Sequence, residues 1–198
     1  NKQEIWKSIL SKSLCSTSYT KIYARKCIIQ LVSSNDKTAF LLQNHLQGSC
    51  NSKINIGLYF NNELISLMSF GKPRFNKKYD WELLRYCTKK YTTVVGGASR
   101  LFDFFKRNYA GSIISYCDLR YSTGQLYQLL KMKLLHQSAP NYFYTKDCIV
   151  LESRNKYQKH KLVKLLSNFN PNLTEAQNMF NNGYRRIWDC GNLVYVFD

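Results

Sequence analysis

Apolar positions recur at helical spacing at the start of the chain and at strand spacing soon after it. Residues 3–14 place their apolar side chains on one helical face, which predicts an amphipathic helix. Residues 21–32 are rich in β-branched side chains and predict a strand. Asn35 or Asp36 then has the side chain expected of a helix N-cap, before an apolar run at 40–42.

The next segments have the pattern of paired strands. Residues 54–60 and 64–70 are two apolar runs separated by Asn61-Asn62, which predicts a β-hairpin because asparagine tolerates positive φ. Residues 81–87 form a further short apolar run and predict another strand.

Strand and helix patterns then alternate through the middle of the chain. A β-branched run at 92–95 leads through two glycines into an apolar helix, and 112–117 is a short buried strand ended by Asp118. A helix at 124–131 and a strand at 142–144 follow. This alternation predicts an α/β (α+β) fold, with a mixed central sheet flanked by helices.

The tail has a different character. Residues 154–166 predict a basic helix, and 174–180 a second helix with Thr174 as its N-cap. Residues 185–197 predict a terminal hairpin that turns at 190–192. We therefore expect one domain over residues 1–150 and a basic helical and hairpin appendage over 151–198.

The charge of the chain adds a partner to this picture. The 198 residues include 29 Lys and Arg but only 12 Asp and Glu, a formal charge of +17, with 44% hydrophobic residues. Every third of the chain is positive, so the excess belongs to a folded body. Such a balance predicts a polyanionic partner, DNA or RNA, although a solvated lysine-rich surface is the alternative.

The cysteines and the apolar runs indicate a compartment. Seven scattered cysteines include no C-x-x-C pair, which argues against a zinc ribbon, and Cys87, Cys117 and Cys148 are expected to be reduced and buried. No signal peptide and no apolar run near 18 residues are present, so we predict a cytoplasmic protein without a membrane partner. A start at Asn1 suggests a fragment of a longer chain.

A pair of glycines stands where the central strand meets its helix. Without a β-carbon, Gly96 and Gly97 let the backbone approach a ligand closely, and the free N–H groups of the helix start favour phosphate. A tight strand-to-helix turn is the alternative. The order of hairpin, strand, glycine turn, helix, strand, helix and strand resembles that of GNAT acyltransferases.

The GNAT phosphate-binding pattern is Gln/Arg-x-x-Gly-x-Gly/Ala. The run Thr93-Val94-Val95-Gly96-Gly97-Ala98 is similar to it but has Thr93 where glutamine or arginine is expected. The resemblance implies a GNAT-like fold with acyl-CoA or another acyl donor, but the departure leaves the donor itself open. The residues that would bind it are Val95, Gly96, Gly97, Ala98 and Ser99.

A second group of residues resembles the Mom family, which modifies adenine bases in phage DNA on a GNAT-like fold. His45, Arg85, Asp118 and Tyr127 match, in order and local context, the polar residues thought important there, within about residues 40–146. Asp118 ends a central strand, where α/β sheets place ligands, and is suited to orient or deprotonate an amine.

The other three residues have chemical alternatives. Arg85 is suited to hold an anionic group bidentately. His45 is a candidate base or metal ligand, or simply a helix-end cap, and no other metal ligand is proposed. Tyr127 is a candidate acid or oxyanion donor, or simply a half-buried aromatic residue.

A further resemblance covers nearly the whole chain. Several segments are similar to the C-terminal region of phage homing-endonuclease-like proteins, in which the nuclease module lies upstream. The segments are 57–64, 71–75, 82–87, 95–99 and 187–192. This resemblance implies a phage protein that acts in the cytoplasm of a bacterial host.

Two basic clusters contain no acidic residue and are the candidate nucleic-acid contacts, because Lys and Arg neutralise phosphates and aromatic rings stack on exposed bases. The first is interleaved with Phe75 and Tyr79 and the second lies on the predicted tail helix; a solvated charged face is the alternative. Their members are Lys72, Arg74, Lys77 and Lys78, and Arg154, Lys156, Lys159, Lys161 and Lys164.

Three functions follow from these observations. The first is a transferase that attaches an acyl-type group to a flipped base of double-stranded DNA, with adenine favoured. The second is a non-catalytic DNA-recognition domain that directs an upstream nuclease. The third is a GNAT enzyme for a small amine or a protein. Nuclease chemistry within this chain is disfavoured, because its 12 acidic residues are dispersed.

Overall fold

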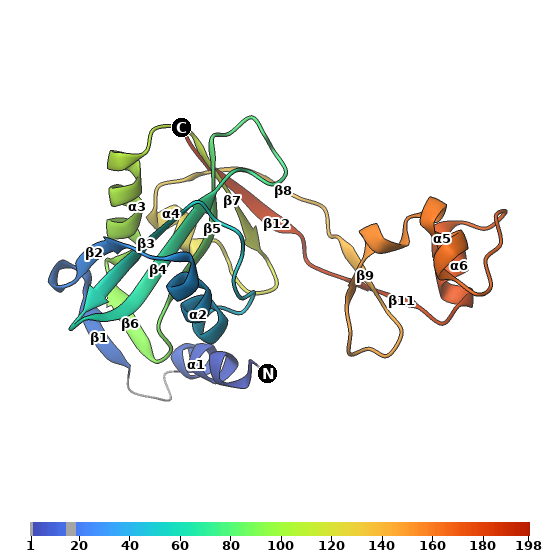
Figure 1. Cartoon of the computed structure of the whole chain (residues 1–198), viewed down its shortest axis with the longest axis horizontal. Coiled ribbons are helices and arrows are strands. Elements are labelled where there is room, and N and C mark those ends of the chain that lie inside the picture. Colours follow the sequence, from blue (N-terminus) through green and yellow to red (C-terminus); the bar gives the residue numbers. More distant parts are fainter. Residues whose placement is uncertain (1, 15–18) are drawn as a thin grey trace. The chain divides into compact units, whose positions relative to one another are not determined.

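The computed structural model describes residues 2–14 and 19–198, which belong to two compact units (Figure 1). Unit 1 consists of residues 1–116, 124–135 and 194–198, and unit 2 of residues 117–123 and 136–193. These units divide the chain differently from the expected domains 1–150 and 151–198, because the last strand of the chain returns to the sheet of unit 1.

Unit 1 is built on a large sheet with helices against it. Its elements in chain order are α1 (Gln3–Ser13), β1 (Thr20–Tyr23), the 3-10 helix η1 (Ala24–Lys26), β2 (Ile28–Leu31), α2 (Ser34–Asn44), β3 (Ile54–Phe60), β4 (Glu63–Gly71), β5 (Trp81–Thr88), β6 (Thr92–Val95), α3 (Gly97–Asn108), β7 (Ile113–Asp118), α4 (Gln125–Leu129), β8 (Lys133–Gln137) and β12 (Asn192–Phe197).

Seven of these strands form one mixed sheet in the order β2-β3-β4-β5-β7-β12-β8. The strands from β2 to β5 pair antiparallel, whereas β5 and β7 pair parallel. Residues of β4 alternate between the two faces, so that Leu67 packs with α2 and Phe70 packs against α3. The predicted mixed α/β fold, with a central sheet flanked by helices, is therefore confirmed.

The core of unit 1 lies mainly between the sheet and α3. The rings of Phe70 and Phe105 are stacked with their centroids 3.5 Å apart, and both side chains are fully buried. Phe102 packs beside them at 6.5 Å from Phe70. The helix presents these rings because its apolar residues recur at helical spacing after the glycine turn.

The predicted hairpin is confirmed. Strands β3 and β4 are joined by Asn61 and Asn62, whose φ angles are 50° and 63°. Both residues adopt the left-handed conformation that a two-residue turn of this hand requires, which asparagine accepts more readily than most residues.

The N-terminal segment differs from its prediction in two places. The expected strand 21–32 is interrupted by η1, and its first half, β1, pairs parallel with β6 in a separate two-stranded sheet. The cap of α2 is Ser33, whose hydroxyl oxygen accepts from the Asp36 backbone N–H at 3.1 Å; the predicted caps Asn35 and Asp36 lie within the helix. Ala24, which lies in the break between the two strands, is buried.

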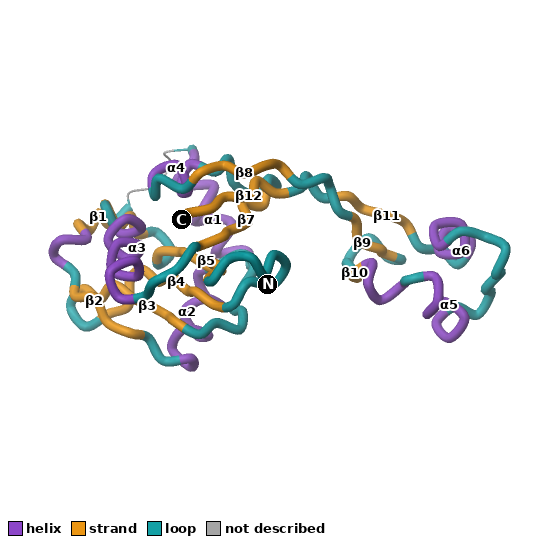
Figure 2. Tube along the Cα trace, turned by 90° about the horizontal axis from the view of Figure 1, so that it is seen from above, coloured by secondary structure: helices purple, strands orange, loops and turns teal. Residues whose placement is uncertain are grey.

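Unit 2 combines a three-stranded sheet with short helices (Figure 2). Its elements are β9 (Tyr142–Thr145), β10 (Glu152–Ser153), the 3-10 helix η2 (Arg154–Tyr157), α5 (Lys159–Leu165), α6 (Glu175–Asn181) and β11 (Arg185–Trp188). The sheet order is β10-β9-β11, and both pairings are antiparallel. The core contains Tyr144, Tyr157, Leu162, Leu166 and Met179.

Helix α6 begins as predicted. Thr174 accepts from the Gln177 backbone N–H at 3.2 Å, while the Gln177 side chain accepts from the Thr174 N–H at 2.9 Å. This reciprocal capping box satisfies N–H groups that the helix start would otherwise leave free.

Two predictions for the tail are wrong, and a strand before the tail was not predicted. The helix expected over 154–166 is broken at Gln158, whose ψ of 141° is extended, into η2 and α5. The expected hairpin 185–197 does not form, because β11 pairs with β9 whereas β12 joins the large sheet. The strand β8 was not predicted, since its five residues are all exposed and show no alternation.

Candidate functional site

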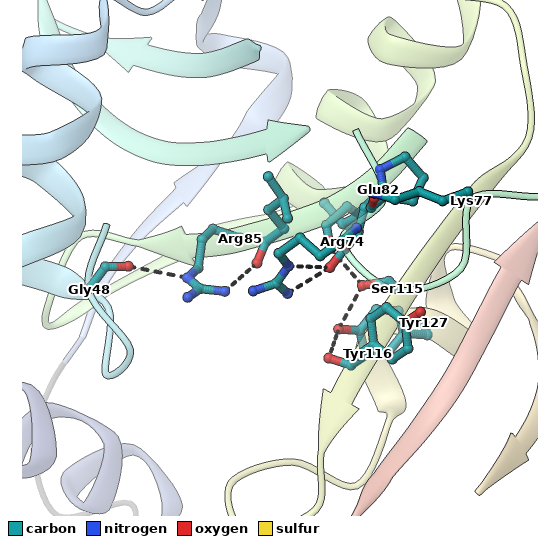
Figure 3. Close-up of polar contacts among 11 residues, drawn as sticks. Gly48, Arg74, Lys77, Glu82, Arg85, Ser115, Tyr116 and Tyr127 are labelled. Atoms are coloured by element: carbon teal, nitrogen blue, oxygen red, sulfur yellow. Dashed lines mark hydrogen bonds and ion pairs between the residues drawn. The ribbon is translucent and has the colours of Figure 1, made fainter. Parts of the chain in front are cut away.

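A group of polar side chains in unit 1 lies where the parallel ladder between β5 and β7 stops. The two strands pair only at Trp81–Ile113 and Glu82–Ile114, although β5 continues to Thr88. Just past the last pair, the Ser115 hydroxyl donates to the Leu83 carbonyl at 2.8 Å, so a side chain replaces the next backbone contact. Glu82, Arg85, Tyr116 and Tyr127 lie around this point (Figure 3).

Arg85 extends from β5 and is held by backbone carbonyls. Its Nε donates to Gly48 at 3.2 Å and its Nη1 to Leu84 at 2.7 Å. Burial lowers the pKa of the guanidinium, and the positive charge of Arg74 lowers it further. Within the described residues Arg85 has no carboxylate partner, so its charge is available to an anionic group.

His45 follows the last turn of α2 as its C-cap residue, close enough to Arg85 for the charge of that cation to act on the imidazole. Its Nδ1 accepts from the Gln47 backbone N–H at 3.1 Å. Burial lowers the pKa of the imidazole to about 4, and the charges of Arg85 and Lys2 contribute to the lowering. The ring is therefore neutral at neutral pH, and a group with such a low pKa is a weak general base.

Tyr127 lies on α4, which starts after Gly124 in the left-handed conformation (φ 88°). Its hydroxyl oxygen is 3.2 Å from the Ser115 hydroxyl, and it donates to the Tyr116 carbonyl at 3.4 Å (Figure 3). The ring is stacked on Tyr195 at 4.7 Å, which fixes its plane. Tyr127 thus presents a positioned hydroxyl beside the end of the ladder.

Asp118 is the last residue of β7 and falls in unit 2, although most of that strand is in unit 1; His45, Arg85 and Tyr127 belong to unit 1. Its carboxylate accepts from Arg120 Nε at 3.0 Å and from Arg120 Nη2 at 2.7 Å, and it also accepts from the Arg120 backbone N–H. These hydrogen bonds raise the pKa of Arg120. A carboxylate engaged by a bidentate guanidinium is a poor proton acceptor, so a base role for Asp118 requires Arg120 to move first.

An ion pair with a buried carboxylate in the same region was not predicted. Glu82 on β5 is fully buried and accepts from Arg74 Nη2 at 2.6 Å, from Arg74 Nε at 2.9 Å and from the Arg74 backbone N–H at 2.7 Å. The signal in the sequence was one acid inside an apolar strand, because such a residue needs a cationic partner when buried. Arg74, a predicted DNA contact, therefore anchors its loop to the sheet.

The glycine turn is formed as predicted between β6 and α3. Gly96 has φ 76° and is exposed, and α3 has no side-chain cap at its start. A β-carbon on Gly97 would lie 2.9 Å from Val94 Cγ1, so this position requires glycine. The backbone N–H groups at Gly97, Ala98 and Ser99 therefore begin a helix whose first turn is open to an anion.

Cations flank this turn that sequence inspection missed. A β-carbon on Gly96 would lie 3.9 Å from Ala24 Cβ, and Ala24 is followed by the exposed residues Arg25 and Lys26. Arg100, in the first turn of α3, donates to the Ala24 carbonyl. The parallel pairing of β1 with β6 brings η1 here, and only the tertiary fold reveals it.

The first basic cluster forms the loop between β4 and β5. Phe75 is 74% exposed, and its ring contacts the edge of Tyr116 at 5.5 Å. Tyr116 is also the residue whose carbonyl accepts from Tyr127. The loop that contains Lys72, Lys77 and Lys78 is therefore adjacent to the end of the β5–β7 ladder.

The second basic cluster lies in unit 2 and is less free than its composition indicated. Lys156 forms an ion pair with Glu152, which precedes the segment, and Lys161 donates to the Asn155 carbonyl at 2.8 Å. The Arg154 guanidinium lies 5.4 Å from the Tyr142 ring centroid. Lys159 remains exposed at the start of α5.

The remaining predictions concern thiols, metals and membranes. Cys117 is buried and Cys87 is half-buried with a pKa raised to about 12 by burial, but Cys148 is exposed, contrary to expectation; Cys15 lies outside the described residues. Over residues 2–14 and 19–198, no group of three or more potential ligands joins His45 to form a metal cluster. No helix in the described part of the chain could span a membrane.

The comparisons with known proteins concern the fold. No family model matches the chain, and no curated protein is similar to it in sequence. Among solved structures, an acetyltransferase of Bacillus subtilis in complex with CoA is 14% identical, with a TM-score of 0.45, and covers 87% of this chain and 99% of its own. An N-acetyltransferase from Staphylococcus aureus Mu50 is 12% identical, with a TM-score of 0.44, and covers 87% of this chain and 97% of its own.

Proposed function

We propose that this protein is an acyl-type transferase with a GNAT-like fold that acts on DNA. The observation that carries the proposal is the positioned group of Arg85, Ser115 and Tyr127 at the end of the β5–β7 ladder. The group combines a cation without a carboxylate partner with two hydroxyls in contact. Such a set is suited to stabilise charge that develops on a carbonyl oxygen and a leaving group.

The acyl donor in this proposal is acyl-CoA. The turn fits its phosphates in two respects: Gly96 offers no side chain, and the α3 start is uncapped. Backbone N–H groups from Gly97 to Ser99 would bind the phosphates, with Arg25 and Lys26 supplying charge in place of the missing cation at Thr93. The donor supplies the activated thioester.

The chemistry assigns a role to each residue. The amine nitrogen of the acceptor attacks the thioester carbon, a C–N bond forms and the C–S bond breaks. Arg85 would stabilise the carbonyl oxygen, and the Tyr127 hydroxyl would give a proton to the departing thiolate. The proton lost by the amine would pass to solvent, because His45 has a pKa of about 4 and is a weak base.

The acceptor in this proposal is a base amine of double-stranded DNA, with adenine favoured. Lys72, Lys77 and Lys78 would hold the phosphate backbone, and the exposed Phe75 ring would stack on a base. An amine inside a duplex is inaccessible, so the base must be flipped out of the stack. The contact between Phe75 and Tyr116 supports delivery of that base toward Tyr127.

A second candidate function is a DNA-recognition domain without catalysis, of the kind expected from the C-terminal region of a phage homing-endonuclease-like protein. Two observations favour it. Asp118, the expected base, is held bidentately by Arg120, and His45 is neutral with a low pKa. A protein that only binds DNA needs neither group in a reactive state.

Mass spectrometry of nucleosides from DNA co-expressed with the protein distinguishes the two functions. The transferase predicts a base with an added acyl-type mass that disappears in Arg85→Gln and Tyr127→Phe, whereas the exposed Arg107→Gln and the remote Tyr109→Phe retain it. Unmodified nucleosides, together with salt-dependent DNA binding by every variant, would support the recognition domain. Binding that ignores salt would instead leave a GNAT enzyme for a small amine or a protein.

A further inference from the structure

Unit 2 contains a pocket of about 360 Å³ between α6 and β11 that the proposed transfer chemistry does not use. Its size falls in the range of about 300–1,000 Å³ that small-ligand sites occupy. The lining includes the rings of Phe180 and Tyr184, the amides of Gln177 and Asn181, and Arg185. Aromatic, amide and cationic groups in one pocket are the chemistry that recognises a nucleotide.

An aromatic ring and a cation are stacked at this pocket. The Arg185 guanidinium carbon lies 4.0 Å from the Phe180 ring centroid, and the ring is 60% exposed. Arg185 Nη1 donates to the Tyr184 carbonyl at 2.9 Å and to the Phe180 carbonyl at 3.3 Å, which holds the guanidinium in place. Because the guanidinium lies over one face of the ring, a nucleobase would stack on the other face, while the fixed cation meets its phosphate.

The two amides supply an edge for hydrogen bonding. The Gln177 carbonyl oxygen accepts from Thr174 at 2.9 Å, so the side chain is oriented and its NH₂ group remains a donor. Asn181 is exposed, and within residues 19–198 its side chain has no hydrogen-bond partner. Amides offer a donor and an acceptor side by side, which matches the edge of a base.

The charge around the pocket is positive. Lys146 lies 5.6 Å from the Tyr184 ring centroid, and the Arg186 guanidinium lies 4.3 Å from that of Tyr142. The nearby carboxylate, Glu175, already accepts from the hydroxyls of Tyr142 and Tyr144 and forms an ion pair with Arg186 at 3.9 Å. Because the Glu175 carboxylate already has these partners, the cations around the pocket can attract an anionic ligand.

We infer that this pocket binds an unpaired nucleobase of single-stranded nucleic acid, with the base on Phe180 and its phosphate on Arg185. A duplex is excluded as the occupant because ring stacking requires a base whose face is exposed. The inference rests on the proposed DNA partner and deepens it, since unit 2 would hold a single strand while the loop between β4 and β5 contacts the duplex backbone.

The test measures binding of the full chain to a short labelled oligodeoxyadenylate by fluorescence anisotropy. Phe180→Ala is expected to weaken this binding roughly 5- to 150-fold, because stacking contributes about 1–3 kcal/mol per base. Phe180→Trp, which keeps a ring, should retain it. Ile149→Ala, at an exposed apolar position in unit 2 outside the pocket, should leave it unchanged.

Two further ligands complete the test of single-strand binding. For a strand of the same length without bases, Phe180→Ala and the native protein should have the same affinity, because no base remains to stack on the ring. Loss of affinity for that strand by the same factor would overturn the inference. So would dAMP that binds as tightly as the oligonucleotide, because the site would then serve a free nucleotide.

Duplex DNA separates this inference from the proposed function. If duplex binding depends on salt while Phe180→Ala binds the single strand normally, the inference about the pocket is overturned but the proposed DNA partner is retained. Absence of binding to every nucleic acid would overturn both. Circular dichroism of each variant checks folding. Because Phe180 is exposed, we expect its replacement to change the free energy of unfolding little.

Discussion

The two units satisfy their carboxylates in different ways. In unit 1 the fully buried Glu82 is neutralised by Arg74, whose side chain is 48% exposed. Unit 2 instead surrounds its acid Glu175 with tyrosine hydroxyls from Tyr142 and Tyr144. The larger unit has an aliphatic and phenylalanine core that encloses one carboxylate, whereas the core of the smaller unit is rich in tyrosine, whose hydroxyls satisfy a carboxylate.

The difference extends to net charge. Unit 1 contains 20 Lys and Arg against 7 Asp and Glu, whereas unit 2 contains 9 against 5. Most of the excess that indicated a nucleic-acid partner therefore lies in the unit with the large sheet. In unit 2 many cations lie over aromatic rings, as Arg185 and Arg186 do. Charge there is combined with stacking surface, which suits exposed bases more than a phosphate backbone alone.

The largest expected effect tests the ion pair that neutralises the buried Glu82 of unit 1. Arg74→Ala leaves the Glu82 carboxylate buried with one backbone N–H as its partner, and should lower the free energy of unfolding by roughly 3 kcal/mol. Arg186→Ala in unit 2 should lower it by only about 1 kcal/mol, because Glu175 retains two tyrosine hydroxyls. Urea unfolding measures both values.

The double variant Arg74→Ala, Glu82→Leu serves as the control for this comparison. It removes both charges and should recover most of the lost stability, because an apolar side chain replaces a stranded carboxylate. Equal losses for Arg74→Ala and Arg186→Ala would contradict the contrast between the two units.

An intermediate effect concerns His45 in acid. Its folded pKa of about 4 lies below the ordinary value of 6.5, so between these values the unfolded chain takes up a proton that the folded chain does not. Stability should therefore fall by roughly 2 kcal/mol as the pH drops from 6.5 to 4, after a discount for partial exposure. His45→Gln should remove this part of the acid loss in urea unfolding.

His160→Gln is the matched control, because His160 is exposed in unit 2. It should leave the loss of stability in acid unchanged. An equal loss of stability in acid for the native protein and for His45→Gln would show that burial of His45 contributes nothing to the pH dependence of stability.

The smallest expected effect concerns a hydroxyl of unit 1 that is buried and has no hydrogen-bond partner among the described residues. The Ser69 hydroxyl is the one buried side-chain oxygen or nitrogen without a partner in the described residues, and it lies opposite Arg85 on β4. Ser69→Ala should raise the free energy of unfolding by about 1 kcal/mol. Ser66→Ala, which removes a hydroxyl bound to the Cys87 carbonyl at 3.3 Å, should lower it by a similar amount.

Urea unfolding in a Trp188→Phe background measures this pair, because Trp6 and Trp81 of unit 1 then remain as the reporters. A destabilised Ser69→Ala would mean that the hydroxyl has a partner such as a buried water, and would remove Ser69 from the comparison.

Local patterns predicted those elements whose partners are close in sequence. The hairpin at Asn61-Asn62, the helix after Gly96 and the capping box at Thr174 all formed as expected, because each depends on residues within a few positions. The terminal hairpin failed for the opposite reason. Its two strands are complementary, but β12 buries Val194 and Val196 in the large sheet, which a hairpin in unit 2 would not achieve.

The candidate site was predicted in part. Arg85, His45 and Tyr127 fall in one unit and interact electrostatically or through Ser115, but Asp118 belongs to the other unit and is occupied by Arg120. Glu82 and the pair Arg25 and Lys26 were missed, because their importance depends on burial and on the pairing of β1 with β6. Neither property has a local signature.

The sequence by itself determined the class of fold, the turns and the excess of positive charge, since these depend on composition and on side-chain periodicity over a few residues. Only the tertiary structure decided which cations remain available. Arg74 is bound to a buried acid, whereas Arg185 lies over an exposed ring beside a pocket. The physical reason is that a charge acquires its role from its neighbours, and those neighbours come from distant strands and helices brought together by burial of the core.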